Sequence, residues 1–339
     1  MSLLRSTRRH VLHTAAAAAL LPLQFLLPAA AHAQAAAGFP AEVRLDWGYY
    51  SPHTLLIKDK GWLEAAFKDT GTQIKWVQSR GSNNSLEFLK VGATDFAGSA
   101  GLSAFIARAN GVPLKVIYNA SWGASQELQV LADSPLHSVK ALKGKRIAVT
   151  KGTAPYFTLL QALADNGLRV SDIRVVHLQH PEGFAALQQK QVDAWIGIDP
   201  HTSIAQAAGA RTIYQNLERR QPSVFSTTEK YLAQYPQVVE RVLQVWASTQ
   251  EWVKSHPDEF KALVAQQTQT GPQVTQLILA RRLYNDPAPG PAVTQALREL
   301  IPLVQEEGIL QRNVDVEGTL AGLQAPEPAR KVLAAAPRP

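Results

Sequence analysis

Cysteine is absent from this 339-residue sequence, and its absence excludes several classes of chemistry. A chain without cysteine forms no disulfide, holds no metal through thiolates, and has neither a thiol nucleophile nor an N-terminal cysteine for lipid attachment. Long basic runs are also missing after the first 33 residues, so nucleic acid is a poor candidate partner.

The common catalytic and nucleotide-binding motifs are missing as well. The sequence has no G-x-S-x-G elbow, no Walker loop, no G-x-G-x-x-G fingerprint and no H-E-x-x-H helix. His177 and His180 form an H-x-x-H pair, but at the end of an expected strand and without a third ligand nearby. We interpret one histidine as turned inward and the other as a loop residue, rather than as a metal site. The sequence therefore predicts no catalytic residue, no metal and no cofactor.

The first 33 residues have the features of an export signal. Three arginines give a basic start, Ala15–Leu27 form an apolar run, and Ala31–Ala33 is an A-x-A cleavage site. The stretch Thr7–His13, TRRHVLH, carries the paired arginines typical of twin-arginine export, with the general route as the alternative. We expect a signal at residues 1–33 that is cleaved near Ala33, and a free periplasmic protein. Without those arginines Lys+Arg falls from 34 to 31 against 27 Asp+Glu, so the formal net charge falls from +7 to +4.

The rest of the chain has the composition and the pattern of an α/β protein. The full sequence is rich in hydrophobic residues (46%) and has few charged ones (18%), which is typical of a globular protein. From Val43 to Tyr214 short apolar runs alternate with helical patterns, as in βαβ units with a mostly parallel sheet. After Tyr231 the pattern is helical as far as Glu307, interrupted by prolines. The expected strands are Val43–Trp47, Ile74–Gln78, Phe96–Ser99, Lys115–Asn119, Leu128–Ala132, Arg146–Thr150, Arg174–Leu178, Ala194–Ile198 and Thr212–Tyr214.

Two lobes are expected, because a short pattern occurs twice. Gly92–Ser99 and Lys190–Asp199 each end a helix, turn on an aspartate and run through a short apolar strand. The expected boundaries are residues 41–126 and 229–323 for lobe I, residues 127–228 for lobe II, and residues 324–339 for a flexible tail. Extended segments at Ser125–Asp133 and Pro222–Thr228 are the expected hinge.

Five polar loops follow expected strands, where open α/β sheets bind their ligands. Each loop also begins a helix, and most place Ser, Thr, Asn or Asp at the N-cap position. Simple capping is one interpretation of each loop. Because unpaired N–H groups and partial positive charge gather at helix N-termini, an anion site is the other. The loops are Gly48–His53, Ser79–Ser85, Gly98–Ser103, Thr150–Tyr156 and Gly197–Ser203.

Aromatic residues flank these loops without helical spacing, so we expect them to form walls around a small organic ligand. They are Trp47, Tyr49, Tyr50, Trp122 and Tyr156.

A family resemblance rests on five segments: Trp47–Pro52, Lys60–Glu64, Gly81–Gly101, Val139–Leu163 and Leu178–His201. In this order they resemble the periplasmic substrate-binding proteins of ABC importers for aliphatic sulfonates, a family that also includes taurine-, nitrate- and thiamine-precursor binders. The resemblance implies the two-lobed type II periplasmic binding protein fold, with a two-strand hinge and a helical C-terminal part. It also implies a monomer that closes on its ligand and delivers it to an ABC permease in the inner membrane.

The resemblance also implies the ligand contacts. Together with Trp122 from the aromatic set, they are Tyr49, Tyr50, Ser51, Ser82, Asn83, Ser99, Ala100, Gly152, Thr153, Tyr156 and Asp199. Asp199 matches the family's aspartate before proline, and it is either a ligand contact or a helix N-cap before Pro200.

The expected ligand is a small organic oxyanion, an aliphatic sulfonate or a related organosulfur compound. A sulfonate stays ionised, so the site must supply hydrogen-bond donors. The ammonium of a taurine-like ligand would need a carboxylate, for which Asp199 and Glu127 are the candidates, so we expect an uncharged organic part. Taurine, nitrate or a thiamine-precursor pyrimidine are the alternative ligands, and a periplasmic enzyme or sensor module on the same fold is the alternative function.

Overall fold

A computed structural model describes residues 38–124 and 126–335. The expected export signal at residues 1–33 lies outside these ranges. Among the described residues, no helix is long and apolar enough to cross a membrane.

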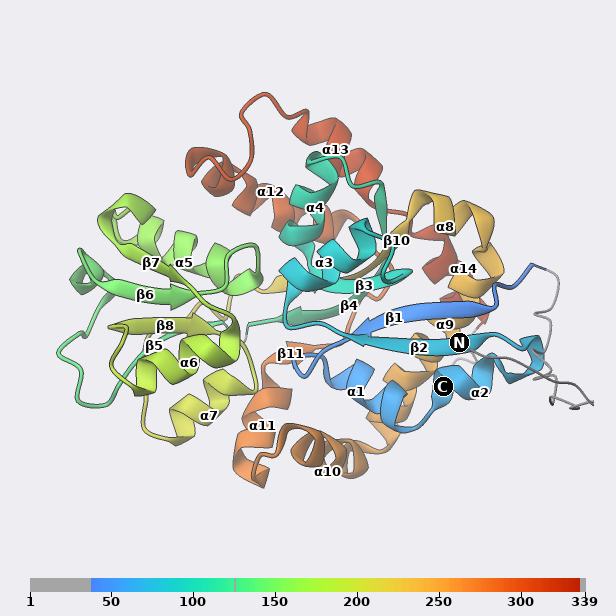
Figure 1. Cartoon of the computed structure of the whole chain (residues 1–339), viewed down its shortest axis with the longest axis horizontal. Helices are drawn as coiled ribbons and strands as arrows, with labels where there is room; N and C mark the ends of the chain where they lie inside the picture. The colour runs from blue at the N-terminus through green and yellow to red at the C-terminus, as the bar shows by residue number, and fades with distance from the viewer. Residues whose placement is uncertain (1–37, 125, 336–339) are drawn as a thin grey trace, which may run out of the picture. The chain divides into compact units, whose positions relative to one another are not determined.

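The strands form two mixed sheets (Figure 1). In spatial order the first sheet contains β11 (Arg282–Leu283), β4 (Leu114–Gly123), β10 (Gln221–Thr228), β3 (Phe96–Ala100), β1 (Glu42–Trp47) and β2 (Gln73–Gln78). The second contains β7 (Arg174–His177), β6 (Arg146–Val149), β8 (Ala194–Gly197), β5 (Glu127–Val130) and β9 (Arg211–Tyr214). All nine expected strands are present, and their ends lie within four residues of the expected ones.

Parallel and antiparallel pairs are mixed in both sheets, whereas the sequence pattern predicts mostly parallel sheets. β1 pairs in parallel with β2 and β3, and β6 pairs in parallel with β7 and β8. Each sheet also contains a reversed strand between two neighbours: β10 runs antiparallel to β3 and β4, and β5 runs antiparallel to β8 and β9. The carboxyl ends of β1, β3 and β6 therefore each lead into a helix.

Helices follow the strands and then dominate the C-terminal part. The first-sheet helices are α1 (Pro52–Asp59), α2 (Trp62–Ala66), α3 (Ser82–Lys90) and α4 (Gly101–Ala109), and the second-sheet helices are α5 (Ala154–Asp165), α6 (His180–Gln188) and α7 (His201–Ala207). The C-terminal helices are α8 (Glu229–Gln234), α9 (Pro236–Ser255), α10 (Pro257–Thr268), α11 (Pro272–Ala280), α12 (Pro291–Glu306), α13 (Val316–Leu323) and α14 (Glu327–Ala335). Several of them begin with proline at the first helical position, where the missing N–H has no helical partner in any case.

The core of the first sheet is aromatic where it approaches the site. Phe96 of β3 and Phe225 of β10 stack with ring centroids 5.4 Å apart, and Trp246 of α9 packs 5.0 Å from Phe225. All three side chains are buried. This packing joins α9 to strands β3 and β10 of the first sheet.

Two expected boundaries are wrong. Residues 221–228, expected in lobe II, form β10 of the first sheet, because their backbone pairs with β3 and β4 along most of its length. The chain therefore passes between the sheets once between β4 and β5 and once between β9 and β10. The expected flexible tail instead contains α14, which packs against α9 with Ala329 and Val332 buried.

Candidate ligand-binding site

A cavity of about 90 Å³ lies where four helices begin. The N-cap residues of α1, α3, α4 and α5 are Ser51, Gly81, Ala100 and Thr153, and all four line the cavity. None of these N-caps makes a side-chain hydrogen bond to its own helix. Simple capping is therefore the wrong interpretation of these four loops. Their first-turn N–H groups and the partial positive charge of the helix ends favour an anion.

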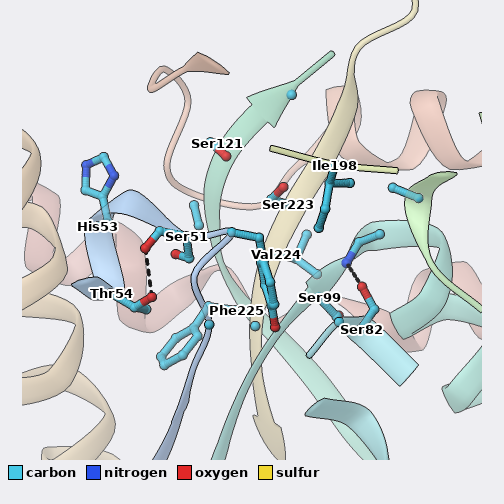
Figure 2. A pocket seen from close by; sticks show the side chains of 18 of the residues that line it. Ser51, His53, Thr54, Ser82, Ser99, Ser121, Ile198, Ser223, Val224 and Phe225 are labelled. Carbon is cyan, nitrogen blue, oxygen red and sulfur yellow. Dashed lines mark hydrogen bonds between the residues drawn. The ribbon is translucent and has the colours of Figure 1, made fainter. Parts of the chain in front are cut away.

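Serine hydroxyls strengthen this donor-rich wall. The Oγ of Ser82 accepts a 2.9 Å hydrogen bond from the backbone N–H of Ala100, which fastens the start of α4 to the start of α3. The Oγ of Ser99 is buried and has no hydrogen-bond partner. Figure 2 shows Ser82 and Ser99 together at one side of the cavity, with Ser51 and His53 at the other. Ser99 is thus placed to donate to a ligand.

Arg282 supplies the positive charge of the cavity. It is the one Lys or Arg among the described residues that line this space. Its Nη2 donates a 2.6 Å hydrogen bond to the carbonyl of Tyr50, whereas its buried Nε has no partner. Arg282 was not predicted from the sequence, because its two-residue strand β11 reaches the cavity by pairing with the distant strand β4.

Asp46 is the one carboxylate among the described lining residues, and its oxygens are already engaged. Oδ1 accepts from the backbone N–H of Gly98 at 2.7 Å, and Oδ2 accepts from Ser79 Oγ at 2.8 Å. Ser79 Oγ is in turn 2.6 Å from the hydroxyl of Tyr50. Burial raises the pKa of Asp46 to about 6. This carboxylate orders the wall rather than offering a free partner to an ammonium group.

Aromatic side chains form another part of the wall. Phe225, Trp246, Tyr284 and His53 all line the cavity. The ring centroids of His53 and Tyr284 are 4.1 Å apart, and burial lowers the pKa of His53 to about 3, so its imidazole is neutral. Neutral rings suit the uncharged part of an organic ligand.

Half of the residues expected at the site line the cavity, and half lie elsewhere. The lining ones are Tyr50, Ser51, Ser82, Ser99, Ala100 and Thr153. The others are Tyr49, Asn83, Trp122, Gly152, Tyr156 and Asp199, none of which lines it.

Their positions explain why they miss the cavity. The ring of Tyr49 packs 5.2 Å from that of His201. The carbonyl of Gly152 accepts a hydrogen bond from Ser103, beside Asn83. Trp122 faces a surface groove, and Tyr156 is buried in the core with its ring 6.3 Å from that of Phe157.

Asp199 is engaged in a buried ion cluster instead. Its Oδ1 accepts from the N–H and the Oγ of Ser203 in the first turn of α7, at 3.2 and 2.6 Å. The same oxygen accepts from Nη1 of Arg281 at 3.1 Å, and Arg281 also pairs with Glu127. Asp199 therefore does not line the cavity, and the N-cap of α7 is Pro200 rather than Asp199, although the Asp199 carboxylate accepts from the first turn of that helix. The partner Arg281 was not foreseen.

A model of the NMT1/THI5-like family matches residues 53–260, which is more than half of the chain. The chain belongs to the NMT1/THI5-like family. This family member is 27% identical over 300 residues to an Escherichia coli (strain K12) protein named for binding aliphatic sulfonates, a match covering 87% of this chain and 93% of that protein. A Bacillus subtilis (strain 168) protein of the same name is 29% identical over 209 residues, 60% of this chain and 63% of that one. That second match spans less than two thirds of the B. subtilis protein.

Solved structures give the same fold for this NMT1/THI5-like chain. The alkanesulfonate-binding protein SsuA from Xanthomonas axonopodis pv. citri, bound to MOPS, has a TM-score of 0.75 at 27% identity and covers 83% of this chain and 98% of its own. The desulfurization enzyme DSZB has a TM-score of 0.64 at 17% identity, which shows a shared fold alone. The expected periplasmic binding protein fold and the family resemblance are confirmed, and the relatives reported at higher identity are named as binding proteins.

Proposed function

We propose that this chain is the periplasmic solute-binding component of an ABC importer, and that it captures a small organic sulfonate in the cavity. The observation that carries the proposal is the convergence of four helix N-termini without side-chain caps, the free hydroxyl of Ser99 and the guanidinium of Arg282 on one space. A permanently ionised head group with three acceptor oxygens satisfies such a set of donors.

The walls also support an uncharged organic part. The cavity's carboxylate, Asp46, already accepts two hydrogen bonds, and Glu127 and Asp199 are held by Arg281. The carboxylates expected to receive an ammonium are therefore occupied. The names of the relatives agree with a sulfonate ligand.

A thermal-shift screen of the mature protein tests the proposal. The compounds are ethanesulfonate, benzenesulfonate, taurine, nitrate, a sulfate ester and an aminopyrimidine. A ligand at about 100 times its dissociation constant should stabilise the fold by about 2.7 kcal/mol. We expect the uncharged-tail sulfonates to raise the melting temperature most. A shift with the pyrimidine and with no oxyanion would show that the sulfonate proposal is wrong.

A further inference from the structure

His180 presents a buried hydrogen-bond acceptor to the cavity. Its Nδ1 is 3.1 Å from Thr150 Oγ1, and that hydroxyl donates its single proton to the carbonyl of Leu178 at 2.7 Å. Because Thr150 has no second proton, Nδ1 of His180 must be the donor, and in the neutral ring Nε2 carries a lone pair. His180 is 1% exposed and lines the cavity, and its Nε2 has no partner.

The position of this lone pair is unusual, because it lies beside helix N-termini. Gly81 is the N-cap of α3 and has no side chain, so the position that its Cβ would take serves as a reference point. That position is 3.4 Å from Nε2 of His180 and 3.4 Å from Cγ2 of Thr153, which is the N-cap of α5. Both helices present N–H donors there without side-chain caps. N–H donors therefore meet two buried acceptors that have no partner, Nε2 of His180 and Oδ1 of Asn83, and of these two residues His180 lines the cavity.

The imidazole of His180 is held neutral. Burial is the main cause that lowers its pKa to about 3, and His201 and Arg80 lower it further. Arg80 is paired with Glu182 on α6, and the nearby ring of His177 is exposed and accepts from the N–H of Lys151. Asp46 is the cavity's carboxylate, and its oxygens accept from Gly98 and Ser79. A ligand that contacts Nε2 must therefore bring its own proton, which an ionised sulfonate lacks.

The cavity has a second, cationic region. Arg282 belongs to the first sheet and donates to the carbonyl of Tyr50, whereas the ring of His180 is held by Thr150, which follows β6 of the second sheet. The anion-attracting guanidinium and the acceptor Nε2 thus belong to different parts of the same space. A ligand that satisfies both must carry an anionic head and a separate proton donor.

We propose that the ligand is a hydroxylated sulfonate whose hydroxyl donates to Nε2 of His180. The proposal rests on the proposed function and narrows its substrate class. A hydroxyl can accept from an N–H of α3 or α5 while it donates to Nε2, so one group satisfies both kinds of partner. An ammonium cannot accept, and it is disfavoured beside the partial positive charge of helix N-termini. The hydroxyl is therefore favoured over an amine.

Matched ligand pairs test the proposal by calorimetry at pH 7. The pairs are 2-hydroxyethanesulfonate with propane-1-sulfonate, and 3-hydroxypropane-1-sulfonate with butane-1-sulfonate, so that each differs by OH against CH₃. At least one hydroxylated probe should bind about tenfold or more tightly than its alkyl partner, because a buried acceptor is otherwise left unpaired. Taurine should bind less tightly than 2-hydroxyethanesulfonate. Equal affinity within both pairs would overturn the proposal.

Variants of His180 complete the test. His180→Leu should reduce the preference to about twofold or less, whereas His180→Gln, whose Oε1 can accept, should keep part of it. His177→Leu changes the exposed histidine three residues away and should leave the preference intact. Calorimetry in two buffers of different ionisation enthalpy should show that no proton is taken up when the ligand binds. Proton uptake that His180→Gln abolishes would mean that the imidazole itself becomes protonated, which contradicts a neutral acceptor at Nε2. Failure of every sulfonate to bind would instead contradict the proposed function.

Discussion

Ser99 is the residue whose role can be isolated most cleanly. Its hydroxyl is buried, unpartnered and part of the cavity wall. Ser99→Ala should therefore weaken ethanesulfonate binding by roughly 10- to 150-fold, because a hydrogen bond to a charged group contributes about 1.5–3 kcal/mol. The unliganded protein should be at least as stable as wild type, since the change removes an unsatisfied polar atom. Titration calorimetry and urea unfolding of the unliganded protein measure the two effects.

Ser226→Ala is the matched control. Ser226 lies on β10, next to β3, and its hydroxyl is also buried and unpartnered, but it does not line the cavity. Its substitution should leave affinity within about twofold. Equal losses in the two variants would indicate a general effect of the sheet rather than a contact at Ser99.

Asp46 should give the protein an unusual pH dependence. Burial raises its pKa in the folded state from 3.8 to about 6, so between these pH values the folded state holds the proton more tightly than the unfolded state. The stability that it contributes is therefore present at low pH and is lost as the pH rises from about 4 to about 6, by about 3 kcal/mol in all. In Asp46→Asn this loss is absent. The hydrogen bonds around residue 46 can be kept in this variant, because the introduced amide can donate to Ser79 and the Ser79 hydroxyl can then donate to Tyr50.

Urea unfolding of the unliganded protein at pH 4, 5, 6 and 7 measures this effect. The stability of Asp46→Asn relative to wild type should rise from pH 4 to about pH 6 and level off towards pH 7. Asp193→Asn is the contrasting variant, because a hydrogen bond from Arg146 lowers the pKa of Asp193. Its stability relative to wild type should fall slightly between pH 4 and about pH 5 and then stay constant, because above that pH the carboxylate is ionised in both the folded and the unfolded state. A constant difference between Asp46→Asn and wild type would contradict the pKa assigned to Asp46.

At the scale of elements, local patterns were sufficient for the strands and for the loops. Apolar runs bounded by turns predicted the nine strands, and the rule that ligands bind at carboxyl ends of strands predicted that Ser51, Ser82, Ser99 and Thr153 share a site. Such patterns repeat within a few residues, so the sequence displays them directly. The helix starts on which the site depends could therefore be found without a structure.

Elements that depend on distant partners could not be found in this way. Arg282 reaches the cavity through a strand of two residues that pairs with β4, and a pattern so short has no periodicity to detect. Tyr156 was expected beside the ligand because it follows a polar loop, but the third position of α5 faces the core. The tail was misjudged from its alanines and prolines, although Ala329 and Val332, three residues apart, mark one buried helix face.

At the scale of the whole molecule, Arg281 joins elements of the two sheets. It follows α11, and its carbonyl accepts from the N–H of Ala124, which directly follows β4 of the first sheet. Its guanidinium bonds to Asp199, Ser203 and Gln206 at 2.8–3.1 Å and pairs with Glu127, all of which lie on elements of the second sheet or directly beside them. Both carboxylates are 1% exposed, so water does not screen the cluster. The cluster therefore opposes separation of the two sheets beside the cavity.

Arg281→Met should lower the free energy of unfolding by about 3–5 kcal/mol, because two buried carboxylates lose their cation. It should also weaken sulfonate binding without touching the cavity wall, since Arg281 does not line it. The double variant Arg281→Met, Asp199→Asn should regain part of the lost stability. Asp199→Asn removes one of the two buried carboxylates that Arg281→Met leaves without a cation. Arg169→Met, which breaks an exposed pair with Glu306, should cost about 0–1 kcal/mol. Urea unfolding and calorimetry of the three variants and wild type measure these differences. An Arg281→Met variant as stable as Arg169→Met would show that the cluster does not hold the two sheets together.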